Sequence, residues 1–287
     1  MKSVYIGTSA YAAAVLALSA DALQPALVVT RPPSARGRGR RLEPSPVAAR
    51  ASELGLELAE PEHLADEAER IAALAPDAVI LCAYGELVRE PLLSTHEILN
   101  VHPSLLPRWR GAAPIEHTLM AGDALSGASI MRLVAELDAG PVCAVESVAV
   151  EPADDYASLS ERLARAGDVA LRRALSGPRV YADQDESAAT YAAKIAAADR
   201  VLDPARGAIE LERRVRALHP HIGARLDGGL GVSAARVDGP PLDSGVAEAR
   251  EGRLFLGTAE GTLELLRVKP AGGREMDAAA YLRGHAV

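Results

Sequence analysis

The sequence contains few cysteines and no long apolar run. The first feature bears on the redox environment of the protein, and the second on whether it crosses a membrane. Two cysteines, Cys82 and Cys143, are present among 287 residues. Each lies in an apolar, strand-like run, so both are predicted to be buried thiols, which favours a reducing, cytoplasmic environment. No apolar run reaches the roughly 18 residues that a membrane span needs, so a membrane protein is not expected.

The sequence also lacks several common functional motifs. There is no G-x-S-x-G, and no serine or cysteine is placed to act as a nucleophile, so the attacking group in any transfer reaction is expected on a substrate. Gly7-Thr8 is not part of a G-x-G-x-x-G, which argues against a dinucleotide cofactor. His219 and His221 have no third ligand at a suitable spacing, so a surface turn is expected there and no metal site is predicted.

Asparagine and tryptophan each occur once, and both fall within residues 99–115. Asn100 stands two residues before His102. An amide donates a fixed, uncharged hydrogen bond, and a histidine moves a proton near neutral pH. A lone pair of this kind is more often a turn beside a core histidine, but the residues that follow favour a reactive pair. Trp109 either packs over a site entrance or contacts another domain.

Residues 1–150 alternate short β-rich runs with helical patterns, which is typical of βαβ units and a mostly parallel sheet. Residues 1–20 share some features with a signal peptide, but a strand, a turn and a helix explain them better. Strands are predicted at residues 4–6, 26–30, 78–82 and 98–101, and helices at residues 10–18, 47–54 and 64–74. Two more strands are expected within residues 126–150, and a closing helix at residues 156–175.

A second domain is predicted after a polar, irregular stretch. Residues 209–218 are expected to form a helix, and short strands separated by glycines and acidic turns follow it. That pattern is typical of a small barrel such as an OB fold. The expected organisation is an α/β domain at residues 1–180, a linker at residues 181–203 and an OB-like domain at residues 204–287.

Asp138 is the third candidate for a reactive group, in a turn between two predicted strands. The intervening chain is long enough for a helix at residues 112–120 and a return strand. In a parallel sheet this would bring the Asp138 turn beside the end of the His102 strand. An aspartate there orients the imidazole and stabilises its cation. With the Asn100 amide, such a cation would stabilise an oxyanion formed when a nucleophile attacks a carbonyl.

These residues resemble the 10-formyltetrahydrofolate-dependent formyltransferases, most closely the members that act on methionyl-tRNA. The resemblance rests on Asn100-x-His102 with Ser104-Leu-Leu-Pro107, on residues 108–115 and on Leu137-Asp138-x-Gly140. It covers most of residues 1–200, and its other matching segments are Gly7-Thr8 and residues 38–46, 83–85 and 190–195.

The resemblance implies a Rossmann-like catalytic domain joined to an OB-like domain that helps to hold tRNA. It implies that Asn100, His102 and Asp138 are catalytic. The implied activity is formyl transfer from 10-formyltetrahydrofolate to the α-amine of methionyl initiator tRNA, in support of translation initiation, by a monomer without a metal. The residues implied to bind the folate co-substrate are Ser104, Leu105, Leu106, Pro107, Tyr84 and Gly85.

The formal net charge of −8 argues against general binding of nucleic acid by the whole surface, but residues 31–41 hold five arginines and no acid. On composition alone, these residues would form a solvated loop. The resemblance instead implies that the loop enters the acceptor end of tRNA. The arginines expected to contact RNA are Arg36, Arg38, Arg40 and Arg41.

Two other functions remain open. A sugar-nucleotide N-formyltransferase would share Asn100, His102 and Asp138 but would not need the arginines. A folate- or RNA-binding protein without catalysis is disfavoured because the trio is complete. The sequence departs from the family at residues 219–225, where an aromatic-rich segment is usual. With one phenylalanine in the whole chain, the second domain is expected to add little stacking on RNA.

Overall fold

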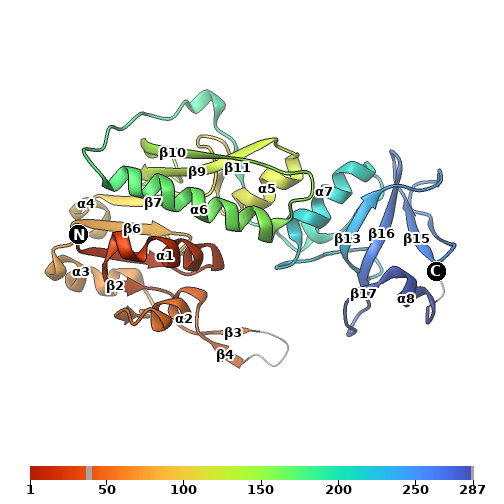
Figure 1. Cartoon of the computed structure of the whole chain (residues 1–287), viewed down its shortest axis with the longest axis horizontal. Coiled ribbons are helices and arrows are strands. Elements are labelled where there is room, and N and C mark those ends of the chain that lie inside the picture. Colours follow the sequence, from red (N-terminus) through yellow and green to blue (C-terminus); the bar gives the residue numbers. More distant parts are fainter. Residues whose placement is uncertain (37–40, 286–287) are drawn as a thin grey trace. The chain divides into compact units, whose positions relative to one another are not determined.

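The computed structural model describes residues 1–36 and 41–285 and contains two compact units, both drawn in Figure 1. Unit 1 comprises Met1–Pro114, Leu125–Ala149 and Ser160–Ala192. Unit 2 comprises Ile115–Ala124, Val150–Leu159 and Ala193–Val287. Within the described ranges, no helix is both long enough and apolar enough to cross a membrane.

A seven-stranded sheet in the described residues forms the centre of unit 1, in the order β10-β9-β7-β6-β1-β2-β5. The first five strands of this sheet along the chain pair in parallel, whereas β9 runs in the opposite direction and pairs antiparallel with both β7 and β10. The predicted α/β fold with a mostly parallel sheet is therefore confirmed. The strands are β1 (Ser3–Gly7), β2 (Pro25–Val29), β5 (Leu58–Ala59), β6 (Ala78–Cys82), β7 (Ile98–His102), β9 (Leu125–Arg132) and β10 (Val142–Ala149).

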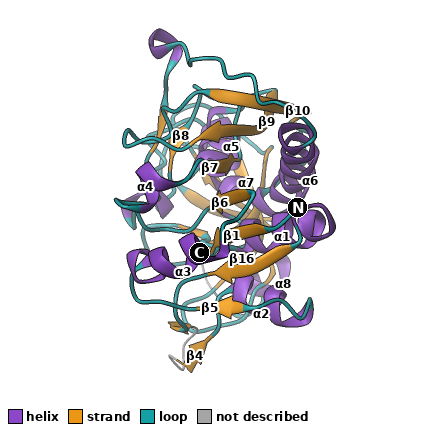
Figure 2. Ribbon diagram, turned by 90° about the vertical axis from the view of Figure 1, so that its left-hand side faces the viewer, coloured by secondary structure: helices purple, strands orange, loops and turns teal. Residues whose placement is uncertain are grey.

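Helices cover both faces of this sheet (Figure 2). On one face lie α1 (Ala10–Leu23) and the part of α6 (Tyr156–Leu175) that belongs to unit 1. On the other lie α3 (Ala68–Leu74) and α4 (Leu92–Thr95). Other helical segments of unit 1 are α2 (Pro46–Glu53) and the 3-10 turns η1 (Leu64–Glu67) and η2 (Glu186–Ala188).

The α3 and α4 face of the sheet presents the side chains on which the site depends. Val79, Leu81 and Ile98 project from it into one buried cluster, together with Ile71 of α3 and Leu92 of α4. Side chains alternate between faces along a strand, so Asn100 and His102 project from the same face as Ile98. Leu81 is the register partner of Asn100 in the neighbouring strand, which agrees with this placement.

The strand that leads to Asp138 runs opposite to the predicted direction. β9 pairs antiparallel with β7, with His102 opposite Ser129 and Leu99 opposite Arg132. The expectation of a parallel return strand was therefore wrong, because α5 (Pro114–Ala121) does not serve as a crossover and leads into the β9–β10 hairpin. Asp138 reaches the site through the loop after β9.

Two pairs of short strands and one isolated bridge complete the described strand pairings of unit 1. The hairpin of β3 (Ser34–Arg36) and β4 (Arg41–Glu43) was not predicted. β8 (Arg110–Gly111) pairs in parallel with β11 (Tyr191–Ala192). An isolated bridge joins Val142 to Ala182. The last two pairings attach the segment after α6 to the region around the predicted site.

The two cysteines differ in environment. Cys82 is fully buried on β6, and burial raises the pKa of its thiol to about 12. Cys143 is only half-buried, so the prediction that it is buried was wrong. It lies on β10, the edge strand, which has a neighbouring strand on one side only.

Unit 2 is built on a six-stranded antiparallel sheet in the described residues, with the path β12-β13-β16-β15-β14 and β17 beside β16. Leu211, Val215 and Leu218 of α7 (Ala208–Leu218) are buried in one cluster with Leu254 and Leu263 of the sheet. The predicted small β-domain is thus present. Its other elements are η3 (Ala198–Arg200), β12 (Ala224–Arg225), β13 (Gly231–Val237), β14 (Ala247–Arg250), β15 (Arg253–Gly257), β16 (Thr262–Lys269), β17 (Met276–Asp277) and α8 (Ala278–Leu282).

Candidate active site

Asn100, His102 and Asp138 meet on the α3 and α4 face of the sheet. The Asn100 Nδ2 donates a hydrogen bond of 3.3 Å to Asp138 Oδ1. The His102 Nδ1 lies 3.7 Å from Asp138 Oδ2. Asn100 and His102 are buried, with 7% and 4% of their surface exposed, so this group is largely withdrawn from water. The structure therefore brings together the three residues that the sequence singled out.

A second oxygen faces the other side of the His102 ring. The Nε2 lies 2.9 Å from the backbone carbonyl of Trp109. A carbonyl oxygen only accepts, so this nitrogen carries a proton. The Asp138 carboxylate faces Nδ1 from the opposite side, at 3.7 Å, which is longer than a hydrogen bond. The imidazole is therefore held between the Trp109 carbonyl and the Asp138 carboxylate.

Trp109 contacts this site through its backbone. Its φ of 62° is in the left-handed region, and its N–H donates to Thr190 Oγ1 at 2.9 Å. Its side chain lies under the guanidinium of Arg108, 4.3 Å from the ring centroid. The carbonyl that faces His102 is therefore held by the conformation of Trp109 and by its contact with Thr190.

The loop after β7 is closed by its own hydrogen bonds. The Ser104 hydroxyl donates to Arg108 O at 2.6 Å, and Ser129 Oγ donates to Ser104 O at 2.7 Å. The N–H of Leu106 donates to the same Ser129 oxygen at 3.1 Å. Ser104 is buried, whereas Leu105, Leu106 and Pro107 are partly exposed. Of this predicted folate-binding stretch, only the last three residues present surface.

Tyr84 and Gly85 follow β6, the parallel neighbour of β7. Parallel strands end at the same edge of a sheet, so this loop and residues 104–107 leave from one edge. Tyr84 is buried in the apolar cluster under α3 and α4, and Gly85 is exposed with a φ of 87°. The two residues therefore differ, since one fills the core and the other forms the surface of the loop.

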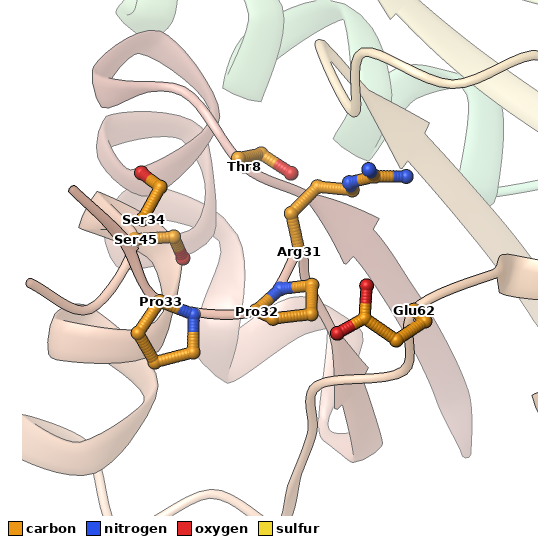
Figure 3. A pocket seen from close by; sticks show the side chains of 7 residues that line it. All are labelled: Thr8, Arg31, Pro32, Pro33, Ser34, Ser45 and Glu62. Carbon is orange, nitrogen blue, oxygen red and sulfur yellow. The ribbon is translucent and has the colours of Figure 1, made fainter. Parts of the chain in front are cut away.

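A cavity of about 380 Å³ opens beyond the carboxyl ends of β1 and β2 (Figure 3). Ligands of open α/β sheets bind at this edge. Arg31 is salt-bridged to Glu86, and Ser45 caps α2 by accepting from Ala48 N–H at 2.9 Å. Sequence reasoning did not find this cavity, although Ser45-Pro46 carries a helix-start signal. The lining residues are Thr8, Arg31, Pro32, Pro33, Ser34, Ser45 and Glu62.

The described parts of the arginine-rich segment belong to β3 and β4, which pair antiparallel and extend from the sheet of unit 1 (Figure 1). Arg36 and Arg41 are register partners at the described ends of the two strands. Arg41 is exposed, as is its neighbour Leu42. Arg38 and Arg40 lie outside the described residues. Ser34, at the start of the hairpin, also lines the cavity.

His219 and His221 have packing partners within unit 2. The His221 ring stacks on Tyr156 with centroids 3.6 Å apart, and its Nε2 lies 2.9 Å from Glu116 Oε1. His219 Nε2 lies 4.0 Å from a carboxylate oxygen of Asp155. These contacts give both histidines a structural role inside unit 2.

Two family models match almost the whole chain. One, described as formyl transferase, matches residues 1–175, and the other, the formyl transferase C-terminal domain, matches residues 194–286. The first model includes Asn100, His102 and Asp138. The chain belongs to the formyl transferase family.

Within this family, similar relatives share one name. The chain is 44% identical to the methionyl-tRNA formyltransferase of Halorhodospira halophila, over 98% of this chain and 95% of that protein. It is 41% identical to the methionyl-tRNA formyltransferase of Leifsonia xyli, over 99% of this chain and 97% of that protein.

Solved structures agree with the fold. An N-formyltransferase from Helicobacter canadensis, in a complex with folinic acid and dTDP-3-aminofucose, matches 92% of this chain and 98% of its own, with a TM-score of 0.68 and 12% identity. HypX from Aquifex aeolicus, in a complex with tetrahydrofolic acid, matches 98% of this chain and 47% of its own, with a TM-score of 0.65 and 16% identity. At these identities the likeness concerns the fold alone.

Proposed function

We propose that this protein transfers the formyl group of 10-formyltetrahydrofolate to the α-amino group of methionyl initiator tRNA. The amine nitrogen attacks the formyl carbon, the bond between that carbon and N10 breaks, and a proton passes from the amine to N10. The products are formylmethionyl-tRNA and tetrahydrofolate. The observation that carries the proposal is the Asn100–His102–Asp138 cluster, in a chain with methionyl-tRNA formyltransferases as its relatives over nearly its full length.

Asn100, His102 and Asp138 have different roles in stabilising the tetrahedral oxyanion. Asn100 and a cationic His102 supply a hydrogen-bond donor and positive charge at a site shielded from water, where both act most strongly. Asp138 contacts both side chains, so it orients the amide and stabilises the imidazolium. Since the attacking nitrogen belongs to the substrate, the protein needs no nucleophile of its own.

The folate co-substrate binds against the loops that follow β6 and β7. Leu105, Leu106 and Pro107 offer a partly exposed apolar surface for a flat ring system, and Gly85 keeps the neighbouring loop free of a side chain. Ser104 and Tyr84 act indirectly, because one closes its loop by hydrogen bonding and the other packs in the core. No metal takes part in the proposed chemistry.

The β3–β4 hairpin contacts the acceptor end of the tRNA through Arg36, Arg38, Arg40 and Arg41. Exposed arginines attract phosphates and release counterions on binding. The cavity at the base of the hairpin contributes hydroxyl groups from Thr8 and Ser34 beside Arg31. A chain of net charge −8 needs such a local basic element to hold RNA.

The domain organisation that supports this activity has a catalytic domain at residues 1–180, a linker at residues 181–203 and an OB-like domain at residues 204–287 that assists with tRNA. The family models, with matches at residues 1–175 and 194–286, support this division. The enzyme acts as a monomer in the cytoplasm, where initiator tRNA is charged and used.

The decisive experiment offers 10-formyltetrahydrofolate with either methionyl initiator tRNA or an amino-sugar nucleotide and follows formyl transfer. Transfer to the tRNA alone is expected. Asn100→Ala, His102→Ala and Asp138→Ala should each lower kcat by about 100-fold or more while the circular dichroism spectrum stays that of the wild type. Transfer to the sugar alone, or a near-normal rate for His102→Ala, would refute the assignment.

A further inference from the structure

The segment that follows α6 is attached by backbone hydrogen bonds to two segments of the active site. Ala182 exchanges two backbone hydrogen bonds of 2.9 Å with Val142, just after the Asp138 loop. Further along, Tyr191 and Ala192 pair with Arg110 and Gly111, just after Trp109. Between these two attachments lies Gln184, and its side chain connects the two halves of the site.

All the polar atoms of the Gln184 amide have partners. Its Nε2 donates to the backbone carbonyls of Asp138, at 2.8 Å, and Gly140, at 2.7 Å. Its Oε1 accepts from Arg110 Nε at 3.0 Å. The reverse orientation of the amide would set its oxygen against two carbonyls and its NH₂ group against a guanidinium. The partners therefore determine which way the amide points.

The Asp138 backbone needs such an anchor. Its φ of 48° is in the left-handed region, which a residue with a side chain adopts at a cost in energy. Two donors from Gln184 hold the carbonyls of this turn from outside the turn. On its other side, the Asp138 carboxylate accepts from Gly111 N–H at 2.8 Å and faces Asn100 and His102. A shift of the Asp138 backbone would move its carboxylate away from Gly111, Asn100 and His102.

Arg110 holds Gln184 in turn. It is buried, and its two terminal nitrogens bind the two oxygens of Glu186 at 2.9 and 2.7 Å. This bidentate pair fixes the plane of the guanidinium. The remaining Nε–H is then directed at Gln184 Oε1, so a continuous chain of contacts runs from Glu186 through Arg110 and Gln184 to the Asp138 turn.

We propose that Gln184 is a positioning residue for formyl transfer: its amide, oriented by Arg110, holds the Asp138 turn so that the carboxylate faces His102. The inference rests on the proposed function for its kinetic consequence. Its structural part, the dependence of the Asp138–His102 contact on Gln184, concerns the free protein and is measurable without any substrate.

The test compares Gln184→Glu and Gln184→Ala with the wild type. Glutamate keeps the length of the side chain and an acceptor for Arg110, but as a carboxylate it has no proton to donate to the two carbonyls. Gln24→Ala is the matched control, because Gln24 is the only other glutamine in the chain and is exposed at the end of α1. Steady-state kinetics and the NMR resonances of the His102 ring are recorded for each protein.

Both Gln184 variants are expected to lower kcat by about 10- to 100-fold with KM nearly unchanged, since a misplacement of about 1 Å at a catalytic group costs rate in this range. The His102 resonances should shift in both variants and stay in place in Gln24→Ala. A wild-type kcat and unshifted His102 resonances in folded Gln184→Glu would overturn the proposal. If Gln184→Ala does not fold, Gln184→Glu alone decides.

The two proposals fail in different ways. If the wild type does not formylate methionyl-tRNA, the proposed function is wrong, and the His102 resonances of the Gln184 variants still decide whether Gln184 positions Asp138. If the wild type formylates methionyl-tRNA and Gln184→Glu does so equally fast with unshifted His102 resonances, the function stands and Gln184 has no positioning role.

Discussion

Gly140 shows how tightly single residues constrain the Asp138 loop. A Cβ atom added to Gly140 would lie 1.8 Å from the backbone oxygen of Arg132, far inside any contact distance. That oxygen belongs to the end of β9, so it moves only if the strand moves. The glycine in the motif Leu137-Asp138-x-Gly140 is therefore required by a close approach of two backbone segments, and the Asp138 position depends on it.

Gly140→Ala is expected to lower the rate of formyl transfer by about 10-fold or more and to lower the thermal midpoint, because overpacking of this kind typically costs about 1–3 kcal/mol and displaces backbone. Gly177→Ala is the matched control, since nothing lies within 4 Å of the Cβ position there. Kinetics and thermal unfolding of both variants test this. Wild-type values for Gly140→Ala would mean that the loop accommodates the methyl group without moving Asp138.

At the level of elements, helix starts and strand positions are predictable because local chemistry specifies them. Ser9 ends the first turn and caps α1, accepting from Ala12 N–H at 3.1 Å, as its place after Gly7-Thr8 indicates. Residues 78–82 form a strand buried on both faces, as their continuous apolar run indicates. The presence of these elements follows from short-range signals in the sequence.

Strand direction and long-range contacts have no comparable local signal. The pattern of residues 125–132 predicts a strand but is the same for either direction, which is why β9 was wrongly expected to be parallel to β7. The Asn100–His102–Asp138 site was predictable because rare residue types and a family resemblance mark it. Gln184 has no comparable sequence signal. It lies 46 residues from Asp138 in the sequence and contacts the Asp138 backbone, a group that every residue has.

The sheet of unit 2 contains a charge cluster with a predictable pH response. Glu264 on β16 is buried, and Arg253 and Arg236 bind its carboxylate. The hydrogen bonds from Arg253 chiefly lower the pKa of Glu264, against the opposing effect of burial, and Arg236 adds to the lowering. A carboxyl whose pKa is lowered in the folded protein stabilises the fold fully at a pH above its pKa in the unfolded chain, about 4.3. That contribution is lost as the pH falls through the pKa of the folded protein.

Glu264→Gln should therefore reduce the free energy of unfolding at pH 7 by about 1 kcal/mol, a modest value because both arginines are half-exposed. It should also flatten the loss of stability below about pH 4.3. Urea unfolding at pH 7 and at pH 3.5 measures both effects. Glu251→Gln, at an exposed turn residue, provides the baseline. An equally steep acid response in Glu264→Gln and the wild type would show that other carboxyls cause it.

At the scale of the whole molecule, the net charge has the same sign as that of the proposed tRNA substrate, but residues 31–41 are basic. The formal net charge is −8, and four arginines of the unit 2 sheet are paired with acids: Arg236, Arg250, Arg253 and Arg267. Residues 31–41 contain no acid, and Ser34, Ala35 and Arg41 of β3 and β4 are exposed. Attraction of an RNA phosphate backbone is therefore expected chiefly at residues 31–41.

Arg41→Ala tests this distribution through the salt dependence of tRNA binding. Each phosphate contact to a single strand contributes about 0.7 to the slope of log K against log salt, so the slope should fall by about that amount and the affinity should weaken most at low salt. Arg165→Ala, at an exposed arginine on α6, should leave the slope unchanged. Fluorescence anisotropy with labelled tRNA between 50 and 300 mM salt, roughly the range over which phosphate contacts weaken, measures this. If the slope is the same in Arg41→Ala and Arg165→Ala, the exposed end of β4 does not contact phosphate, and the RNA must bind elsewhere on the molecule.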